Sequence, residues 1–290
     1  MSRIKLTIAY VGAGYCGWQT QAAAHNGATG ERPSVQSAVM RAVERVLGAK
    51  VHVHGAGRTD SGVHADAQIA HFDVPDAKAG LDWQLALNTL LPHDIRIAGA
   101  QIAAPDFHAQ HDALRKTYLY RLWLDRRYTP PQWFPFVWAC GPLDEQSMED
   151  AARHLCGRHD FAALRNAGTS VAGSVRTVAA IVREASADWP LLRIWRFEAD
   201  GFLKQMARNM MGLLVGAGQG RIAVDDVPRI LTACDRRHRG TTAPAKGLTL
   251  HKVWYAEDLE AGAFYAERER AGRGGTPRSQ GTPTWHKPQP

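Results

Sequence analysis

The chain of 290 residues carries 35 Lys and Arg against 28 Asp and Glu, which gives a formal charge of +7 and a pI near 9.4. Its length and its 45% of hydrophobic residues are typical of a soluble protein with a sizeable core. It has no apolar run that could span a membrane and no signal-peptide layout, and its four cysteines are too far apart for a zinc knuckle or a disulfide framework. We therefore expect a cytoplasmic protein, whose positive charge permits a polyanionic partner.

The first part of the chain predicts elements in the order β-α-β-β-α-β. Apolar residues alternate in the expected strands and recur at helical spacing in the expected helices. The clearest helix follows Ser34, a residue type that caps helix N-termini, and ends at Gly48, a residue type that terminates helices. The expected elements are a strand at 3–10, a helix at 35–47, strands at 51–54 and 68–74, a helix at 83–91 and a strand at 94–102.

The same order returns in the second part, with a short helix at 227–234 inserted before the last strand. The expected elements are a strand at 116–125, a helix marked by apolar residues from 148 to 155, strands at 175–185 and 191–200, a helix at 202–215 and a strand at 248–255. Two such units predict a duplicated, ferredoxin-like α+β architecture, and two sheets that meet edge to edge would shield their exposed strands. We expect halves at 1–106 and 107–258.

Two segments fall outside this pattern. From about Glu267 the chain loses its apolar content, so we expect 259–290 to be a disordered basic tail. Gly12 to Gly17 satisfies G-x-G-x-x-G directly after a predicted strand. A dinucleotide site would need a helix that opens at this motif, but the chain continues into a glycine-rich loop that runs to Pro33. We therefore interpret the glycine motif as a decoy.

A turn rich in Gly, Asp and Ser separates two of the predicted strands, and its sequence from Gly57 to Ala65 is Gly-Arg-Thr-Asp-Ser-Gly-Val-His-Ala. An Asp in a tight loop is usually a turn former, so Asp60 alone does not indicate catalysis. The whole string closely resembles the catalytic loop of the tRNA pseudouridine synthase A family. The resemblance implies that Asp60 attacks the target uridine and that Arg58 helps to hold the base out of its stack.

The resemblance extends in matching order over roughly residues 3–256. Phe107–Ala109, followed by Arg115–Tyr118, resembles the second signature of the family. In that signature a Tyr packs on the target base, and the role falls on Tyr118. Tyr120, on the same face of the predicted strand, is the competing residue.

A third signature of the family resembles Phe202-Leu203-Lys204-Gln205-Met206-Ala207-Arg208-Asn209. In the family its Arg pairs with the catalytic Asp, which implies an ion pair between Arg208 and Asp60. Residues 243–248 resemble the closing segment, although Lys246 stands where the family often has an acid.

The resemblance implies a pseudouridine-synthase fold with a largely antiparallel sheet, and a homodimer. It implies an isomerase that converts uridine to pseudouridine in the anticodon stem-loop of tRNA, at positions 38, 39 and 40. Asp60 would be the nucleophile, on the sugar or on the ring, and Tyr118 is the candidate to accept the ring-carbon proton. We expect no cofactor and no metal, because phosphate-loop and nucleophile-elbow motifs are absent and the histidines at 52, 54, 108 and 111 lack a zinc-binding pattern.

Two other functions compete with this interpretation. A catalytically inactive protein that binds structured RNA would keep the basic surface but would need neither Asp60 nor Arg208. The presence of both residues argues against it. A dinucleotide enzyme that uses Gly12 to Gly17 is a more distant third.

Overall fold

The computed structural model describes residues 1–19, 33–166, 173–233 and 240–258. Met1–Trp254 form one compact unit, and the described residues Tyr255–Asp258 belong to a second one. The tail expected at 259–290 lies outside the described residues. Within the described ranges, none of the helices combines the length and the apolar character needed to cross a membrane.

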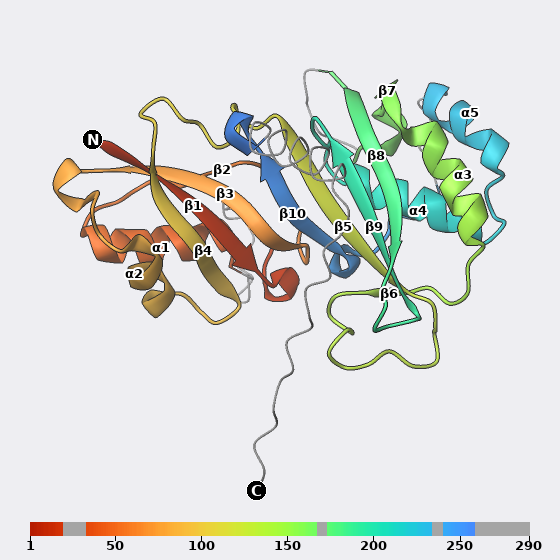
Figure 1. The fold of residues 1–290 in the computed structure, drawn as a ribbon, viewed down its shortest axis with the longest axis horizontal. Helices are drawn as coiled ribbons and strands as arrows, with labels where there is room; N and C mark the ends of the chain where they lie inside the picture. Colours follow the sequence, from red (N-terminus) through yellow and green to blue (C-terminus); the bar gives the residue numbers. More distant parts are fainter. Residues whose placement is uncertain (20–32, 167–172, 234–239, 259–290) are drawn as a thin grey trace, which may run out of the picture. The chain divides into compact units, whose positions relative to one another are not determined.

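The described strands of the first unit form one ten-stranded sheet in the order β4-β1-β3-β10-β5-β9-β8-β7, with β2 paired to β3 and β6 to β5 (Figure 1). Neighbouring strands are antiparallel except in the β3–β10 and β5–β6 pairs. The strands are β1 (Ser2–Tyr10), β2 (His54–Gly55), β3 (His64–Val74), β4 (Ile95–Ala103), β5 (Arg115–Trp123), β6 (Trp138–Ala139), β7 (Gly157–Asp160), β8 (Val175–Ala185), β9 (Leu192–Ala199) and β10 (Leu248–Trp254).

The sheet consists of two half-sheets with the same internal order. The first reads β4-β1-β3-β2 and the second β10-β5-β9-β8. If the four strands of each half are numbered along the chain, both halves have the spatial order 4-1-3-2, as in a ferredoxin-like unit. They join where Thr249 and Leu250 of β10 pair in parallel with His64 and Ala65 of β3. The predicted α+β fold with a largely antiparallel sheet is confirmed. The predicted domain boundary after residue 106 falls in the connection from β4 to β5 and stays a prediction.

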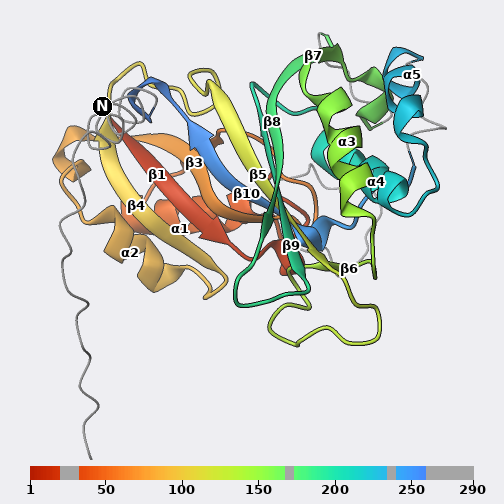
Figure 2. The same ribbon diagram turned by 45° about the vertical axis from the view of Figure 1, so that its right-hand side comes forward.

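The helices flank the half-sheets to which they belong (Figure 2). In the first half α2 packs on β4 and α1 packs on α2, whereas in the second α3 packs on β8 and on α4. Local signals set the bounds of α1, because the Ser34 side chain accepts a hydrogen bond from the backbone N–H of Ser37 and Gly48 adopts a left-handed conformation after the last turn. The helices are α1 (Val35–Leu47), α2 (Trp83–Leu90), α3 (Glu145–Leu155), α4 (Met206–Gly218) and α5 (Val227–Thr232).

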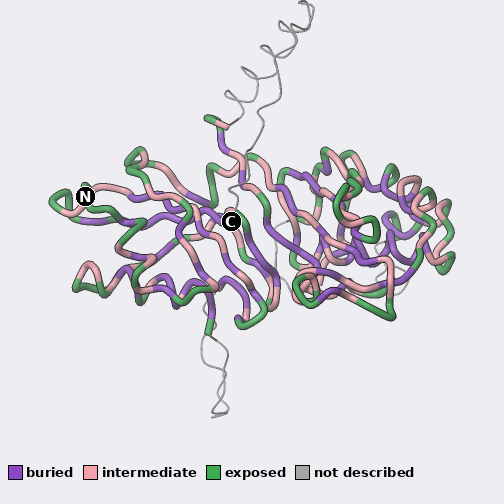
Figure 3. Tube along the Cα trace, turned by 60° about the horizontal axis from the view of Figure 1, so that its bottom comes forward, coloured by how far each residue is buried: buried purple, intermediate pink, exposed green. Residues whose placement is uncertain are grey.

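The core follows the strands and α4, and Figure 3 shows buried stretches in many parts of the chain. On β1, Ile4, Leu6 and Ile8 are each at most 1% exposed. In α4 every residue is buried except Arg208. A helix enclosed in this way has little freedom to shift, so α4 holds its one accessible side chain in a fixed position.

Several element boundaries differ from those that the sequence predicts, and the strand expected at 68–74 already begins at His64. The helix expected from residue 202 begins at Met206, because Gln205 has a φ of 62° and interrupts the helical path. The strand expected at 51–54 is limited to His54–Gly55, the two residues that pair with β3.

Candidate active site

The loop that contains Asp60 lies beside the junction of the two half-sheets. It connects β2 to β3, and the first residues of β3 are those that pair with β10. The backbone N–H of Val63 donates to the carbonyl oxygen of Asp60 at 3.1 Å and closes the turn. Asp60 therefore belongs to the first half but stands where residues of the second half can reach it.

The segment that follows β1 supports this loop. The hydroxyl groups of Tyr10 and Thr59 are 2.9 Å apart, the Ser61 hydroxyl donates to the carbonyl oxygen of Tyr15 at 3.1 Å, and the backbone N–H of Trp18 donates to that of Thr59 at 3.2 Å. These contacts fix Thr59 and Ser61, the two neighbours of Asp60 in the loop.

Close approach to the Asp60 loop explains the glycine motif after β1. A Cβ atom on Gly12 would lie 1.9 Å from the carbonyl oxygen of Val63, so any side chain there would displace the loop. Gly12–Gly14 form one 3-10 turn, and the chain continues without an α-helix as far as Gln19. The motif therefore lacks the helix that a dinucleotide site requires at this point.

Two polar side chains on strands of the sheet form hydrogen bonds with the backbone at the start of the loop. Gln68 Nε2 donates to the carbonyl oxygen of Gly57 and Lys116 Nζ donates to that of Ala56, both at 2.8 Å. Burial, helped by the positive charge of Arg176, lowers the pKa of Lys116 to about 8. The sequence predicted neither of these hydrogen bonds, although Lys116 belongs to the Arg115–Tyr118 segment noted in the sequence analysis.

His64 joins three segments of the site. Its Nδ1 accepts a hydrogen bond from the backbone N–H of Gly12 at 3.1 Å, and its Nε2 lies 3.0 Å from the carbonyl oxygen of Pro135. The first contact requires an unprotonated Nδ1, so Nε2 carries the proton and donates it to Pro135. Burial lowers the pKa of His64 and favours this neutral ring. In the sequence, His64 could be recognised only as a member of the Gly57–Ala65 string, and its contacts with Gly12 and Pro135 could not be predicted.

Arg208 reaches Asp60 from α4. Its Nη1 lies 3.0 Å from Asp60 Oδ2, and the two side chains are 15% and 20% exposed, respectively. Its Nε donates to the carbonyl oxygen of Ala243 at 2.8 Å, and the backbone N–H of Ala243 donates to the carbonyl oxygen of Arg208 at 3.1 Å. The guanidinium is thus oriented from two sides, and it stabilises negative charge on a carboxylate that a ligand can still approach.

Tyr118 lies on β5 close to Asp60 and is 7% exposed. Its ring meets Phe202 edge to face at a centroid distance of 5.0 Å. Burial, followed by the proximity of Tyr10 and of the Asp60 carboxylate, raises the pKa of the Tyr118 hydroxyl, which is therefore protonated at neutral pH.

Tyr120, the competing residue, has a different environment. It is fully buried, and its hydroxyl donates to the carbonyl oxygen of Pro244 at 2.7 Å. A Cβ atom on Gly247 would lie 2.6 Å from its ring. Tyr120 therefore packs beneath the closing segment, which favours Tyr118 as the tyrosine that meets a substrate.

Arg58 is not brought together with Asp60. Its side chain is exposed and forms no hydrogen bond or ion pair with any residue in the described ranges. The site therefore combines Asp60, Arg208 and Tyr118, while the guanidinium of Arg58 faces solvent.

Comparison with known proteins gives consistent matches. A family profile described as tRNA pseudouridine synthase matches residues 151–256. The tRNA pseudouridine synthase A of Lawsonia intracellularis is 50% identical over 260 residues, which cover 88% of this chain and 100% of that protein. That of Oleidesulfovibrio alaskensis is 50% identical over 272 residues, covering 89% and 98% of the two chains, and that of Geobacillus kaustophilus is 38% identical over 257 residues, covering 88% and 95%.

The close packing of the glycine motif predicts a contrast between two of its members. Gly12→Ala should reduce activity by at least about tenfold, because the new methyl group must push Val63 and with it the Asp60 turn. Gly14→Ala should retain activity, since a Cβ atom there would meet nothing closer than Asp94 Oδ2 at 3.9 Å. Turnover of tRNA by the two purified variants measures the contrast. Equal activity of the two would show that the loop does not depend on this contact.

Proposed function

This chain belongs to the tRNA pseudouridine synthase A family, and on that premise we propose that it converts uridine to pseudouridine in the anticodon stem-loop of tRNA, at positions 38, 39 and 40, with Asp60 as the nucleophile. The reaction breaks the bond from the sugar carbon to ring N1 and forms one from the same carbon to ring C5. The C5 proton leaves and N1 gains a proton, so substrate and product are isomers. The proposal requires neither a metal nor a cofactor.

The ion pair between Asp60 and Arg208 carries the proposal. A carboxylate acts as a nucleophile only in its ionised form, and the guanidinium of Arg208, 3.0 Å from Oδ2, places a positive charge beside it. Both side chains are partly exposed, so an extruded base with its sugar can approach the free carboxylate oxygen. Because Oδ2 is held by Arg208, Oδ1 is the atom available for attack.

Tyr118 and Arg58 have complementary roles in this proposal. The Tyr118 ring would pack on the extruded uracil, because it lies close to Asp60 and is held from the side by Phe202. Arg58 would enter the space that the base leaves in its stack, for which an exposed guanidinium without a partner among the described residues is suited.

Removal of the ring proton also falls to Tyr118. Because its hydroxyl is protonated at neutral pH, it can accept the C5 proton only if it passes its own proton on at the same time. The Asp60 carboxylate, whose charge adds to burial in raising the pKa of Tyr118, is the neighbouring group that receives that proton as its own bond to the substrate breaks.

The resemblance further supports a homodimer and a cytoplasmic location as parts of the same proposal. Light scattering of the purified protein measures the first of these directly. A single-subunit mass in solution would remove the homodimer without affecting the proposed chemistry.

The role of Asp60 predicts the outcome of a tritium-release assay on tRNA labelled at uridine C5. The wild-type protein should release tritium without added metal or cofactor. Asp60→Ala should lower the rate at least about a thousandfold, as expected when a nucleophile is removed, but should still bind tRNA. Asp188→Ala, which removes an exposed carboxylate in the turn between β8 and β9, should match the wild type.

Two results of this assay would contradict the proposal. Release by Asp60→Ala at the wild-type rate would keep the reaction but remove Asp60 from its role. Binding of tRNA without release by the wild type would favour the catalytically inactive RNA-binding protein.

A second prediction compares the two tyrosines of β5. Tyr118→Phe keeps the ring that packs on the base but removes the proton acceptor, so turnover should fall by about a hundredfold or more with little change in tRNA affinity. Tyr120→Phe loses its hydrogen bond to Pro244 and should affect thermal stability more than turnover. Single-turnover kinetics and filter binding separate the two effects, and the opposite ranking of the variants would assign the role to Tyr120.

A further inference from the structure

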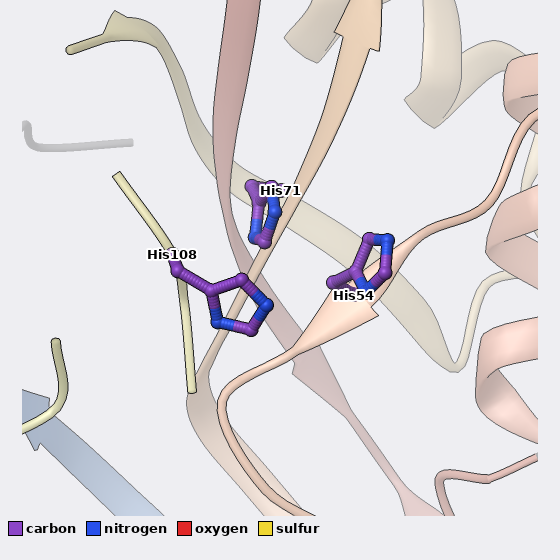
Figure 4. A group of neighbouring side chains, drawn as sticks. All are labelled: His54, His71 and His108. Carbon is purple, nitrogen blue, oxygen red and sulfur yellow. The ribbon is translucent and has the colours of Figure 1, made fainter. Parts of the chain in front are cut away.

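Three histidines from separate segments meet on the first half-sheet (Figure 4). His54 on β2 and His71 on β3 are partners in register, and His108 lies in the connection from β4 to β5. Each offers one ring nitrogen to a group in which all such atoms lie within 4.8 Å of one another. Neither the conversion of uridine nor the support of the Asp60 loop uses these side chains.

The cluster lies on the face of the half-sheet that α2 does not cover. Phe72 packs edge to face on Trp83 of α2 at a centroid distance of 5.2 Å, so the neighbouring His71 points to the opposite face. His71 is only 2% exposed, but His54 is exposed and His108 is intermediate. The group therefore opens to solvent on the side of His54.

Backbone groups determine where the protons of two rings lie. The N–H of Ala109 donates to His71 Nδ1 at 3.1 Å, and those of Gln110 and His111 donate to His108 Nδ1 at 3.2 Å. A nitrogen that accepts a hydrogen bond carries no proton, so in the neutral rings Nε2 is protonated. These two Nε2–H groups have no hydrogen-bond partner in the described ranges, which leaves one unused donor on a histidine that is almost fully buried.

Charged side chains of both signs stand near the rings. Burial, followed by His54, Arg3 and His108, lowers the pKa of His71 to about 4, and burial is also the main cause of the lowered pKa of His54 and of His108. Two carboxylates act in the opposite direction: Asp73, which is paired with Arg3 at 2.7 Å, and Asp112, which accepts a hydrogen bond from the backbone N–H of His108. Lys5 is the partner of His71 in register on β1. Neutral rings that present N–H donors favour an anion over a cation.

A metal ion fits this arrangement poorly. A histidine that binds a metal through one nitrogen usually donates the proton on its other nitrogen to an acceptor. Here, a metal on Nε2 of His71 would place an Nδ1 proton against the N–H of Ala109, and His108 would meet the same conflict.

We infer that His54, His71 and His108 form a hydrogen-bond-donor site for a phosphate group, either of an RNA backbone or of free phosphate. Each ring offers one nitrogen within 4.8 Å of those of the other two, and rings this close together can donate to different oxygens of one phosphate. For RNA the inference rests on the proposed function. His54 is six residues from Asp60 in the sequence, so their Cα atoms lie at most about 22 Å apart, within the span of one tRNA arm.

Long-range nitrogen–proton NMR of the histidine rings tests the premise and the ligand together. The free protein should show the Nε2–H form for His71 and His108. Addition of tRNA should shift these resonances if the source is RNA, and addition of inorganic phosphate should shift them if the site takes the free ion. Unchanged resonances with both would overturn the inference, and so would a zinc-induced shift that shows direct ligation.

A binding assay gives an independent test with a matched control. His54→Phe keeps an aromatic ring against His71 but removes its donors, and should raise the Kd for tRNA by about three- to tenfold. His154→Phe makes the same change at an exposed histidine of α3 and should leave the Kd unchanged. If the wild type binds tRNA and His54→Phe binds it equally well, the RNA site is excluded while the proposed function stands. If the wild type binds no tRNA, the proposed function fails and the phosphate titration alone decides on the site.

Discussion

The contact on which the site depends is the ion pair between Asp60 and Arg208, two residues 148 positions apart in the chain. One comes from a loop of the first half and the other from a helix of the second. Their distance is therefore set by the place where the half-sheets join, through two residue pairs between β3 and β10. Because the fold is duplicated, a loop of one half and a helix of the other meet at this junction, and the two charges come together there.

The parts around this pair are stiff for different physical reasons. On one side, α4 is enclosed along its whole length except at Arg208, so packing fixes the guanidinium. On the other side, the Asp60 loop has little apolar surface to bury and is held by hydrogen bonds from Tyr10, Gln68 and Lys116 and their surroundings. A carboxylate that must meet a large substrate can thus remain partly exposed and still keep its position.

Much of this arrangement could be predicted from the sequence where the determinants are local. The bounds of α1 follow from Ser34 and Gly48, and the repeated order of strands and helices predicted both half-sheets. The start of α4 could not be predicted, because the left-handed conformation of Gln205 depends on the surrounding fold rather than on residue preference. The histidine cluster was missed for a related reason: only strand register and the path of the β4–β5 connection bring its members together.

The central claim is that the carboxylate of Asp60 reacts with the target uridine, and the most direct measurement is the mass of a trapped adduct. An anticodon stem-loop that carries 5-fluorouridine at the target position has no proton to lose from C5, so the reaction should stop while enzyme and RNA are covalently joined. The account predicts an adduct on the peptide that contains Asp60, and none with Asp60→Ala. An adduct on any other residue, or one that persists in Asp60→Ala, would contradict it.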